Sequence, residues 1–464
     1  MAIEIDLEVL DFRFKYRDTL MWPFIRNALF LKAIYEMFGL ANSNEFSNKA
    51  YRLIPSYLFF TLNSNPFTKN LNGKNDILFF SSGVVNVKHG HKYINRLYDH
   101  FALEYPRKSL IIEDSFRMQY FRPRFFPNVK SLDYISIASL IKSRLKKTVN
   151  TDKENIDRFI NLIKSRFLYK FKNDVWKGLT LVLEKISVKL PFLYEYYSRL
   201  FEIIEPKIMF LEDGSYGSMS YVLKWAVEKG IVTGEFQHGI TSLNHPAYNY
   251  SQEILGSAYK DYLPQYYLTF GKYWSSAINT SSKDVIIGNP YIIEYVKSLT
   301  EKSKINTKRR ILFISGGTVY SFIKKLAVGL RKTLPVSEFD IAIRPYPGEI
   351  GLVKERYGNL EQDNISLDFG NLYDSLSSYD IIVGVEFSTV LFEAMLFKKK
   401  IFVFDGPLFF YNTKDPIFNT FKDAQELSIK IFDRVDNSYD VNYYWDPSPC
   451  LNYRNFINTT IGKF

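Results

Sequence analysis

The chain has 464 residues, 46% of them hydrophobic, and carries 60 lysines and arginines against 49 aspartates and glutamates, a formal net charge of +11. This hydrophobic content excludes a disordered chain, and the length suffices for about two to four domains. The charge indicates an anionic partner. Because the basic residues are scattered and no zinc-finger spacing or RNP-type strand accompanies them, a membrane surface or an anionic substrate is favoured, and no nucleic-acid partner is expected.

The first 60 or so residues predict helices. Residues 16–31 place apolar side chains at helical spacing with charges between them, which fits packing on a domain or lying flat on a membrane; packing is favoured. The N-terminus lacks the basic start and apolar run of a signal peptide. The most hydrophobic stretch, residues 20–38, contains Arg26, Lys32 and Glu36, so no membrane-spanning helix is predicted.

From residue 75 onward, short apolar runs alternate with amphipathic stretches. The first series predicts strands at 76–80, 109–112, 134–137, 207–211 and 232–236. The second predicts strands at 267–271, 284–290, 311–315, 340–344, 365–367, 380–384 and 400–404. Strands that alternate with helices form parallel sheets covered by helices. The predicted fold class is therefore α/β, with two doubly wound, Rossmann-like domains facing across a cleft.

The predicted division places an N-terminal domain with a helical leading segment at residues 1–265 and a C-terminal domain at 266–440. Residues 441–464 form a tail that we expect to pack back on the first domain. The single cysteine, Cys450, lies in this tail; it excludes an internal disulfide framework and fits a reducing cytosol. Open α/β sheets bind ligands at the carboxyl ends of their strands, so the cleft is the expected site.

Three turns at strand ends of the C-terminal series suit a phosphate. The first has two glycines, whose backbone N–H groups can approach an anion, followed by a helix-capping threonine. The second begins with an arginine that can pair with phosphate oxygens, and the third places two hydroxyls at a helix start. Each alone could be a simple turn or N-cap. Together they predict a nucleotide site made of Gly316, Gly317, Thr318, Arg344, Tyr346, Pro347, Glu386, Ser388, Thr389 and Glu393.

The order of these motifs, Ser-Gly-Gly at 315–317, Arg-Pro-Tyr-Pro at 344–347 and Phe-Ser-Thr-Val-Leu-Phe-Glu-Ala-Met at 387–395, resembles the donor domain of GT-B glycosyltransferases. It is most similar to bacterial capsule and lipopolysaccharide enzymes that use CMP-activated sialic acid or Kdo, and to CDP-glycerol transferases. Those enzymes hold the nucleotide phosphate with a His-Pro pair and a Ser-Ser or Ser-Thr pair. Here Ser388–Thr389 matches the second pair, and Tyr346–Pro347 stands where His-Pro would be. The resemblance covers about residues 205–405.

In the N-terminal series, the strand at 207–211 ends in Glu212 and Asp213, followed by a glycine-containing turn into a helix. An inverting sugar transfer needs a base to take the proton of the acceptor hydroxyl, and a carboxylate at a strand end suits that role. The alternative is a helix cap with both carboxylates in solvent. Asp213 is the preferred base, because Glu212 points the opposite way if the strand period continues.

The next strand leads into Gln237, His238 and Gly239, a Gln-His-Gly element that also resembles the surface-polysaccharide transferases. His238 is predicted to bind the acceptor or a phosphate, or to be the base itself. Gln237 and Gly239 are expected to border the acceptor, as are His89 and His91 in the loop after the first strand. These two histidines lack an evident third ligand, so no zinc site is predicted there.

The resemblance implies a glycosyltransferase of bacterial surface polysaccharide synthesis, such as O-antigen or capsule. A nucleotide-sugar donor, with a CMP-sugar favoured, would bind the C-terminal domain, and a lipid-linked or oligosaccharide acceptor the N-terminal domain. No Asp-x-Asp triplet occurs, which agrees with metal-independent inverting transfer in which helix ends and basic side chains stabilise the leaving phosphate.

No metal or cofactor is expected. The predicted location is the cytoplasm, as a peripheral protein on the anionic inner face of the plasma membrane. Two alternatives stay open: a CDP-polyol phosphotransferase of the teichoic-acid type, and a non-catalytic subunit that binds a nucleotide or glycan.

Overall fold

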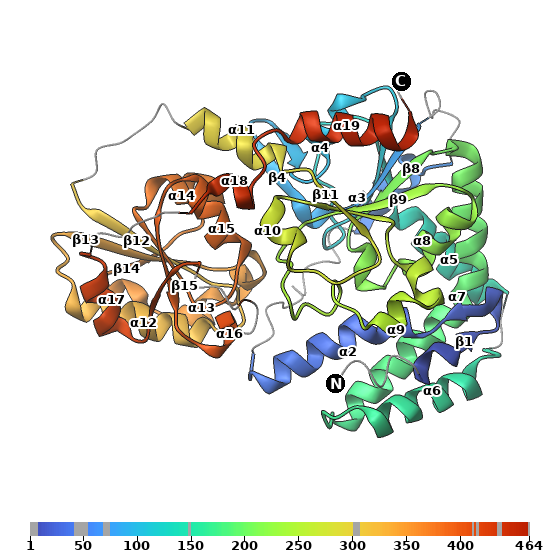
Figure 1. The fold of residues 1–464 in the computed structure, drawn as a ribbon, viewed down its shortest axis with the longest axis horizontal. Coiled ribbons are helices and arrows are strands. Elements are labelled where there is room, and N and C mark those ends of the chain that lie inside the picture. The colour runs from blue at the N-terminus through green and yellow to red at the C-terminus, as the bar shows by residue number, and fades with distance from the viewer. Residues whose placement is uncertain are drawn as a thin grey trace.

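The computed structural model describes residues 8–40, 54–67, 75–146, 150–299, 307–410, 413, 417–433 and 439–462. Two lobes lie side by side, each built around its own sheet (Figure 1). The first lobe holds the blue, green and yellow segments and the second the orange ones, while the red C-terminal helix lies back on the first lobe.

The first sheet has seven parallel strands in the order β11-β10-β9-β8-β3-β6-β7. These are β3 (Ile77–Ser82), β6 (Ser109–Asp114), β7 (Val129–Ser131), β8 (Ile208–Leu211), β9 (Val232–Phe236), β10 (Tyr266–Thr269) and β11 (Lys283–Ile286). Two short antiparallel pairs accompany it, β1 (Arg13–Phe14) with β2 (Thr19–Leu20) and β4 (Asn86–His89) with β5 (Lys92–Asn95).

Helices cover both faces of this sheet. They are α2 (Trp22–Met37), α3 (Ile54–Asn63), α4 (Asp99–Glu104), α5 (Asp133–Leu145), α6 (Lys153–Arg166), α7 (Asn173–Ile204), α8 (Ser220–Glu228), α9 (Gln252–Leu255), α10 (Lys272–Ser275), α11 (Pro290–Leu299) and the C-terminal α19 (Pro449–Ile461). Leu78 and Phe80 of β3 belong to a core shared with α2, α7 and α8, whereas Ile77 and Phe79 belong to one shared with α4 and α19. This alternation follows from the two-residue period of a strand, and burial on both faces explains why β3 is apolar throughout.

Residues 16–31 pack on the first domain, as favoured by the sequence. Within α2 the side chains of Trp22, Phe24, Ile25 and Leu29 are buried. The prediction of a strand at 134–137 is wrong, because these residues begin α5. Ile135, Ser139 and Ser143 are buried at a four-residue spacing, which is a helical period that a four-residue window could not reveal. Among the described residues, no helix has the length and apolarity needed to cross a membrane.

The second sheet has six parallel strands in the order β14-β13-β12-β15-β16-β17. These are β12 (Arg309–Ile314), β13 (Phe339–Arg344), β14 (Ile365–Leu367), β15 (Ile381–Gly384), β16 (Lys400–Phe404) and β17 (Asn419–Phe421). Its helices are α12 (Tyr320–Thr333), α13 (Val353–Tyr357), α14 (Leu372–Ser378), α15 (Thr389–Leu396), α16 (Pro407–Phe410) and α17 (Ala424–Lys430). The structure thus confirms the predicted fold class, α/β with two parallel-sheet domains.

The strand pairing differs from the predicted division at residue 266. Strand β10 pairs with β9, Tyr266 lying opposite Gly234, and β11 pairs with β10. Strands β10 and β11 therefore belong to the first sheet, whereas the predicted second domain began at residue 266. The alternation of strands and helices does not reveal which sheet a strand joins, because that choice depends on partners distant in the chain.

A shared hydrophobic cluster joins the two domains. Phe270 and Trp274 of the first domain pack in one core with Leu312 and Phe392 of the second. Trp445, which follows α18 (Val441–Tyr444), lies within this cluster; its ring stacks on Phe270 with centroids 4.9 Å apart, and its Nε1 donates to the Phe392 carbonyl at 2.9 Å. The chain then continues into α19 on the first domain (Figure 1).

Candidate active site

A cavity of about 420 Å³ lies where the carboxyl ends of β12, β13 and β15 approach the first domain. The residues of the predicted nucleotide site that line it are Gly316, Arg344, Tyr346, Pro347, Ser388, Thr389 and Glu393. The first domain contributes Val84, Val87, Arg96 and Tyr291. The three turns therefore converge, as expected for the adjacent carboxyl ends of parallel strands.

The first turn already holds a carboxylate. The Gly316 N–H donates to Glu386 Oε2 at 2.9 Å, and the Thr318 hydroxyl donates to Glu386 Oε1. The Gly317 N–H donates to Ser315 Oγ at 3.1 Å. A Cβ at Gly316 would come 2.2 Å from Glu386 Oε2, so this contact requires glycine. Gly317, Thr318 and Glu386 do not line the cavity. The Gly316 and Gly317 N–H groups, which were predicted to bind phosphate, donate to protein oxygens instead.

Glu349 ties the first turn to the second. Its buried carboxylate accepts hydrogen bonds from Ser315 Oγ at 2.8 Å, the Tyr346 N–H at 2.8 Å and Arg356 Nη1 at 2.9 Å. Glu349 was not among the predicted site residues. The signal was present, because a glutamate three residues into a helical turn can complete a capping box, here with Tyr346.

Arg344 does not extend a free guanidinium into the cavity. Its Nη1 lies 2.8 Å from Asp368 Oδ1, and its Nη2 donates to the Gly370 carbonyl at 2.8 Å. Its present contacts hold the loop after β14. A phosphate in the cavity would therefore compete with Asp368 for the positive charge of Arg344.

Arg96 is the cation that the first domain brings to this cavity, and it was not among the predicted site residues. Burial opposes its charge, but Tyr373 and Glu393 of the second domain and, to a smaller extent, Glu212 of the first raise its pKa. Burial raises the pKa of Glu393, and the charge of Arg96 opposes this shift. A lone arginine after a short strand carries no signal in the sequence, since its partners lie more than a hundred residues away.

Asp213 and His238 form an ion pair at the carboxyl ends of β8 and β9. His238 Nε2 lies 2.9 Å from Asp213 Oδ1; the Asp213 side chain is 47% exposed and that of His238 is 16% exposed. Asp213 has a φ of 57°, a left-handed conformation that is uncommon for a residue other than glycine and is often found at functional sites. Among the described residues, His238 Nδ1 has no hydrogen-bond partner, and Glu235 Oε1 lies 4.0 Å from it.

Burial and the Asp213–His238 ion pair together determine the ionisation states of these two residues and of the neighbouring Glu212 and Glu235. Burial favours neutral His238, but the Asp213 carboxylate outweighs it and raises the pKa of His238 to about 9. Burial also opposes ionisation of Asp213, yet His238 lowers its pKa below the ordinary value. Burial raises the pKa of Glu235 to about 7 and, with the charge of Asp213, that of Glu212 to about 8. Near pH 7 the pair is therefore ionised and Glu212 is protonated.

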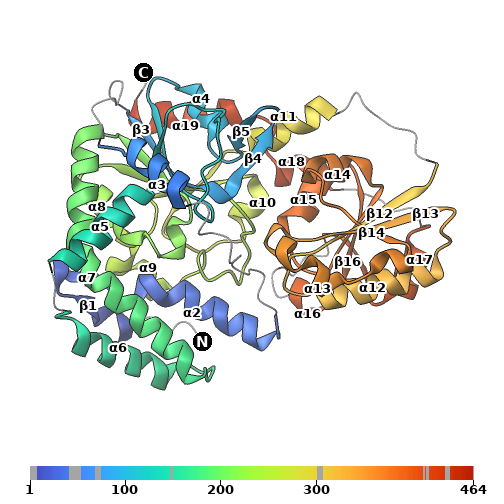
Figure 2. The same ribbon diagram turned by 180° about the vertical axis from the view of Figure 1, so that it is seen from behind.

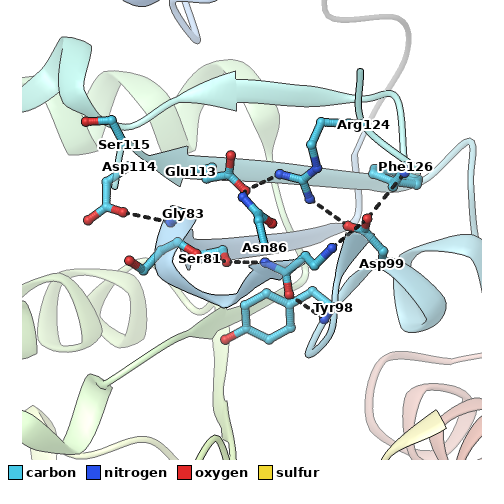
Figure 3. Close-up of polar contacts among 12 residues, drawn as sticks. Ser81, Gly83, Asn86, Tyr98, Asp99, Glu113, Asp114, Ser115, Arg124 and Phe126 are labelled. Carbon is cyan, nitrogen blue, oxygen red and sulfur yellow. Dashed lines mark hydrogen bonds and ion pairs between the residues drawn. The ribbon is translucent and has the colours of Figure 1, made fainter. Parts of the chain in front are cut away.

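A buried polar network fixes Glu212. Glu212 Oε2 accepts the Ser82 N–H at 2.8 Å and Ser81 Oγ at 3.1 Å, and Asn95 Nδ2 donates to Ser81 Oγ at 2.6 Å. Figure 3 shows how this network continues from the end of β3 to a buried ion pair, in which Arg124 Nη2 lies 2.8 Å from Asp99 Oδ1. The network holds the strand ends of β3 and β6 in register with β8.

The four predicted acceptor residues do not lie in one site. Gln237 is buried, and its amide bridges the Gly239 carbonyl, 2.9 Å from Nε2, and the Phe270 N–H, 2.9 Å from Oε1. His89 lines a larger cavity of about 900 Å³ between β4, α11 and the loop after β14, whereas His91 is exposed outside that lining.

Two residues connect the carboxylate cluster with the nucleotide-site turns. Arg96 interacts with both Glu212 and Glu393, as described above. Burial raises the pKa of Tyr35 of α2, and Glu386 and Tyr346 add to this shift. Burial likewise raises the pKa of Tyr216, whose ring lies 5.5 Å from that of His238, and Tyr35 adds to that shift. Arg96 and Tyr35 thus have neighbours both among the second-domain turns and in the carboxylate cluster, while Asp213 and His238 do not themselves line the cavity. In the described ranges, no group of three or more His, Cys, Asp or Glu side chains is arranged to hold a metal ion.

Comparison with protein-family models and with curated proteins gave no match. Among solved structures, UDP-GlcNAc 2-epimerase from Methanocaldococcus jannaschii matches at 11% identity and a TM-score of 0.44, over 83% of this chain and 99% of that one. The Neisseria meningitidis UDP-GlcNAc 2-epimerase bound to UDP-GlcNAc matches at 12% identity and a TM-score of 0.43, over 83% and 98%. A glycosyltransferase from Rickettsia africae matches at 12% identity and a TM-score of 0.39, over 84% and 98%. Similarity at this level does not identify an activity.

Proposed function

We propose that this protein is a glycosyltransferase that binds a nucleotide-activated sugar in the 420 Å³ cavity and transfers the sugar to an acceptor hydroxyl beside Asp213. The observation that supports this most is the position of Arg96, which comes from the first domain and lines the cavity with Glu393 of the second; both Glu393 and Glu212 raise its pKa. Arg96 would thus lie between an anionic leaving group bound in the cavity and an acceptor bound near the carboxylates of the first domain.

In the proposed step, an acceptor oxygen attacks the anomeric carbon of the donor and inverts it. The hydroxyl proton passes to the Asp213 carboxylate, which His238 keeps ionised, and the bond from the anomeric carbon to the phosphate oxygen breaks. The charge that develops on the phosphate is stabilised by Arg96 and by the N-terminus of α15, where Ser388 and Thr389 lie. Glu212, whose raised pKa of about 8 keeps it protonated near neutral pH, is not available to accept the proton.

The first test is Asp213→Asn. Asparagine keeps the side-chain shape and tolerates the left-handed backbone, but it cannot take a proton. We expect turnover to fall by about 10²-fold or more, with nucleotide affinity within a few-fold of wild type. Asp284→Asn is the matched control, since Asp284 is an exposed aspartate on edge strand β11. Wild-type turnover in Asp213→Asn would refute its role as the base.

The donor is identified by thermal shift with CMP, UDP and GDP, followed by assays with the matching sugars and CDP-glycerol. A CMP-sugar as donor and a lipid-linked or oligosaccharide acceptor of surface polysaccharide remain our proposal. Transfer of glycerol phosphate from CDP-glycerol would instead establish a CDP-polyol phosphotransferase. Nucleotide binding without turnover of any donor would favour a non-catalytic binding subunit.

We further expect full activity in EDTA, because helix ends and basic side chains supply the positive charge in the proposed mechanism. Transfer is measured before and after chelation, and again after Mg²⁺ or Mn²⁺ is restored. Loss on chelation and recovery with metal would contradict this mechanism.

A further inference from the structure

Helix α3 is apolar yet lies on the surface. It contains no charged residue, and of its ten residues only Thr61 is buried. Phe59 is 71% exposed and Leu62 is 60% exposed. Single exposed apolar residues are common on proteins, but contiguous exposed apolar patches mark surfaces that bind another molecule.

The exposed side of α3 continues into α5. An apolar cavity of about 370 Å³ lies between the two helices, lined by Leu58, Leu62, Ile141 and Leu145 among others. Leu145 is 78% exposed at the end of α5. The two helices therefore present one apolar groove rather than scattered side chains.

Basic residues border this groove. Lys142 lines it, and Arg144 and Lys146 are exposed beside Leu145. Lys185 and Lys189 of α7 lie on the same side: burial lowers the pKa of Lys189, and the charges of Lys185 and Arg144 add to this effect. Lys142 is paired with Glu195. The remaining cations leave a surplus of positive charge around the apolar groove.

This surface lies close to the strand ends that carry the candidate site. Tyr57 of α3 stacks on Tyr120, with ring centroids 6.1 Å apart, and Tyr120 donates to Asp133, which also accepts the Ser115 N–H at 2.8 Å. Ser115 directly follows Asp114, whose Oδ1 accepts the Gly83 N–H at 3.1 Å at the end of β3 (Figure 3). The apolar helix is thus anchored beside the cleft edge of the first sheet.

We propose that α3, with the adjoining surface of α5 and α7, docks on an anionic lipid bilayer. The apolar side chains of α3 and α5 enter the boundary between headgroups and acyl chains, and Arg144, Lys146 and Lys185 contact lipid phosphates. A bilayer fits better than a protein partner because apolar residues and an unbalanced positive charge occur together here. The inference goes beyond the transfer reaction, since docking requires neither donor nor acceptor.

The test is flotation of the full-length protein with phosphatidylcholine vesicles, with and without phosphatidylglycerol. Leu62→Glu places a carboxylate in the groove and should lower binding to anionic vesicles about tenfold. Leu451→Glu is the matched control, because Leu451 is 51% exposed on α19, which faces the viewer in Figure 1, whereas α3 faces the viewer in Figure 2. The control should float like wild type, and circular dichroism should show both variants folded.

A second variant tests the charge separately. Lys146→Gln should lower binding about fivefold, and high salt should reduce the difference from wild type. Equal flotation of Leu62→Glu and wild type, or no flotation of wild type with anionic vesicles, would overturn the proposal. So would a wild-type dimer that Leu62→Glu converts to a monomer without any vesicle binding in either protein, since the groove would then join two copies.

Discussion

Two adjacent carboxylates, Glu212 and Asp213, have opposite environments. Glu212 ends buried against Ser81 and Ser82, whereas the left-handed backbone of Asp213 turns its side chain outward to His238. Burial drives the pKa of Glu212 up to about 8, and the histidine drives that of Asp213 down. Pairs of titratable groups whose pKa values are pushed apart mark acid and base roles. This is why we assign proton acceptance to Asp213.

The raised pKa of Glu212 predicts a pH-dependent stability. The folded-state pKa of about 8 lies above the ordinary value of 4.5, so the folded protein binds the proton more tightly than the unfolded chain. This contribution is fully present below about pH 4.5 and is lost as the pH rises to about 8. Glu212→Gln keeps the hydrogen-bonding shape without the charge, so its Tm should exceed that of wild type by roughly 2–4 °C at pH 8.

The measurement is calorimetry of both proteins at pH 5 and pH 8. The advantage of Glu212→Gln should be small at pH 5 and grow at pH 8. Glu202→Gln, at an exposed position on α7, should show no such growth. A constant offset between Glu212→Gln and wild type would mean that Glu212 is ionised in the folded protein throughout this range.

At the scale of elements, the sequence could predict that three turns meet, because β12 pairs with both β13 and β15 and all three strands are parallel. The sequence could not predict which oxygen accepts the Gly316 N–H, because Glu386 lies 70 residues away and is brought to Gly316 only by the tertiary structure. The strand predicted at 134–137 shows the related limit: a short apolar run fits a strand or a helix, and packing of α5 against α7 decides.

The N-terminus of helix α15 lies at the cavity. Ser388 is its N-cap, with Oγ accepting the Val390 N–H at 3.4 Å, and it also lines the cavity. Ser388→Ala removes the cap, costing about 1 kcal/mol of stability, and should lower nucleotide affinity about five- to tenfold. Ser251→Ala is the matched control, because Ser251 caps α9 with the same 3.4 Å contact to the Ile254 N–H.

Both variants are compared by thermal unfolding and by nucleotide titration. They should lose similar stability, while only Ser388→Ala should bind nucleotide more weakly. Equal nucleotide affinity of Ser388→Ala and wild type would leave Ser388 with a capping role alone.

At the scale of the whole molecule, the site depends on how two domains are held together. Arg96 reaches the cavity from the first domain, so the cavity is complete only while the domains stay packed. The sequence pattern predicted two domains. However, the boundary predicted at residue 266 separates β10 and β11 from the sheet that they join, and no local pattern revealed the shared core. That core draws residues from distant segments, Phe270, Phe392 and Trp445 among them, whose proximity no local pattern encodes.

Trp445 provides the test of this dependence. Its ring stacks on Phe270 of the first domain while its Nε1 holds the Phe392 carbonyl of the second, so Trp445→Ala should weaken the junction by about 3–5 kcal/mol. Because the loss falls between the domains, we expect unfolding to split into two calorimetric transitions and nucleotide affinity to fall. Trp225→Ala removes a buried tryptophan of equal size from α8 within the first domain, and it should lower the Tm without splitting the transition. A single shifted transition in Trp445→Ala, with wild-type nucleotide affinity, would show that the cavity does not depend on this contact.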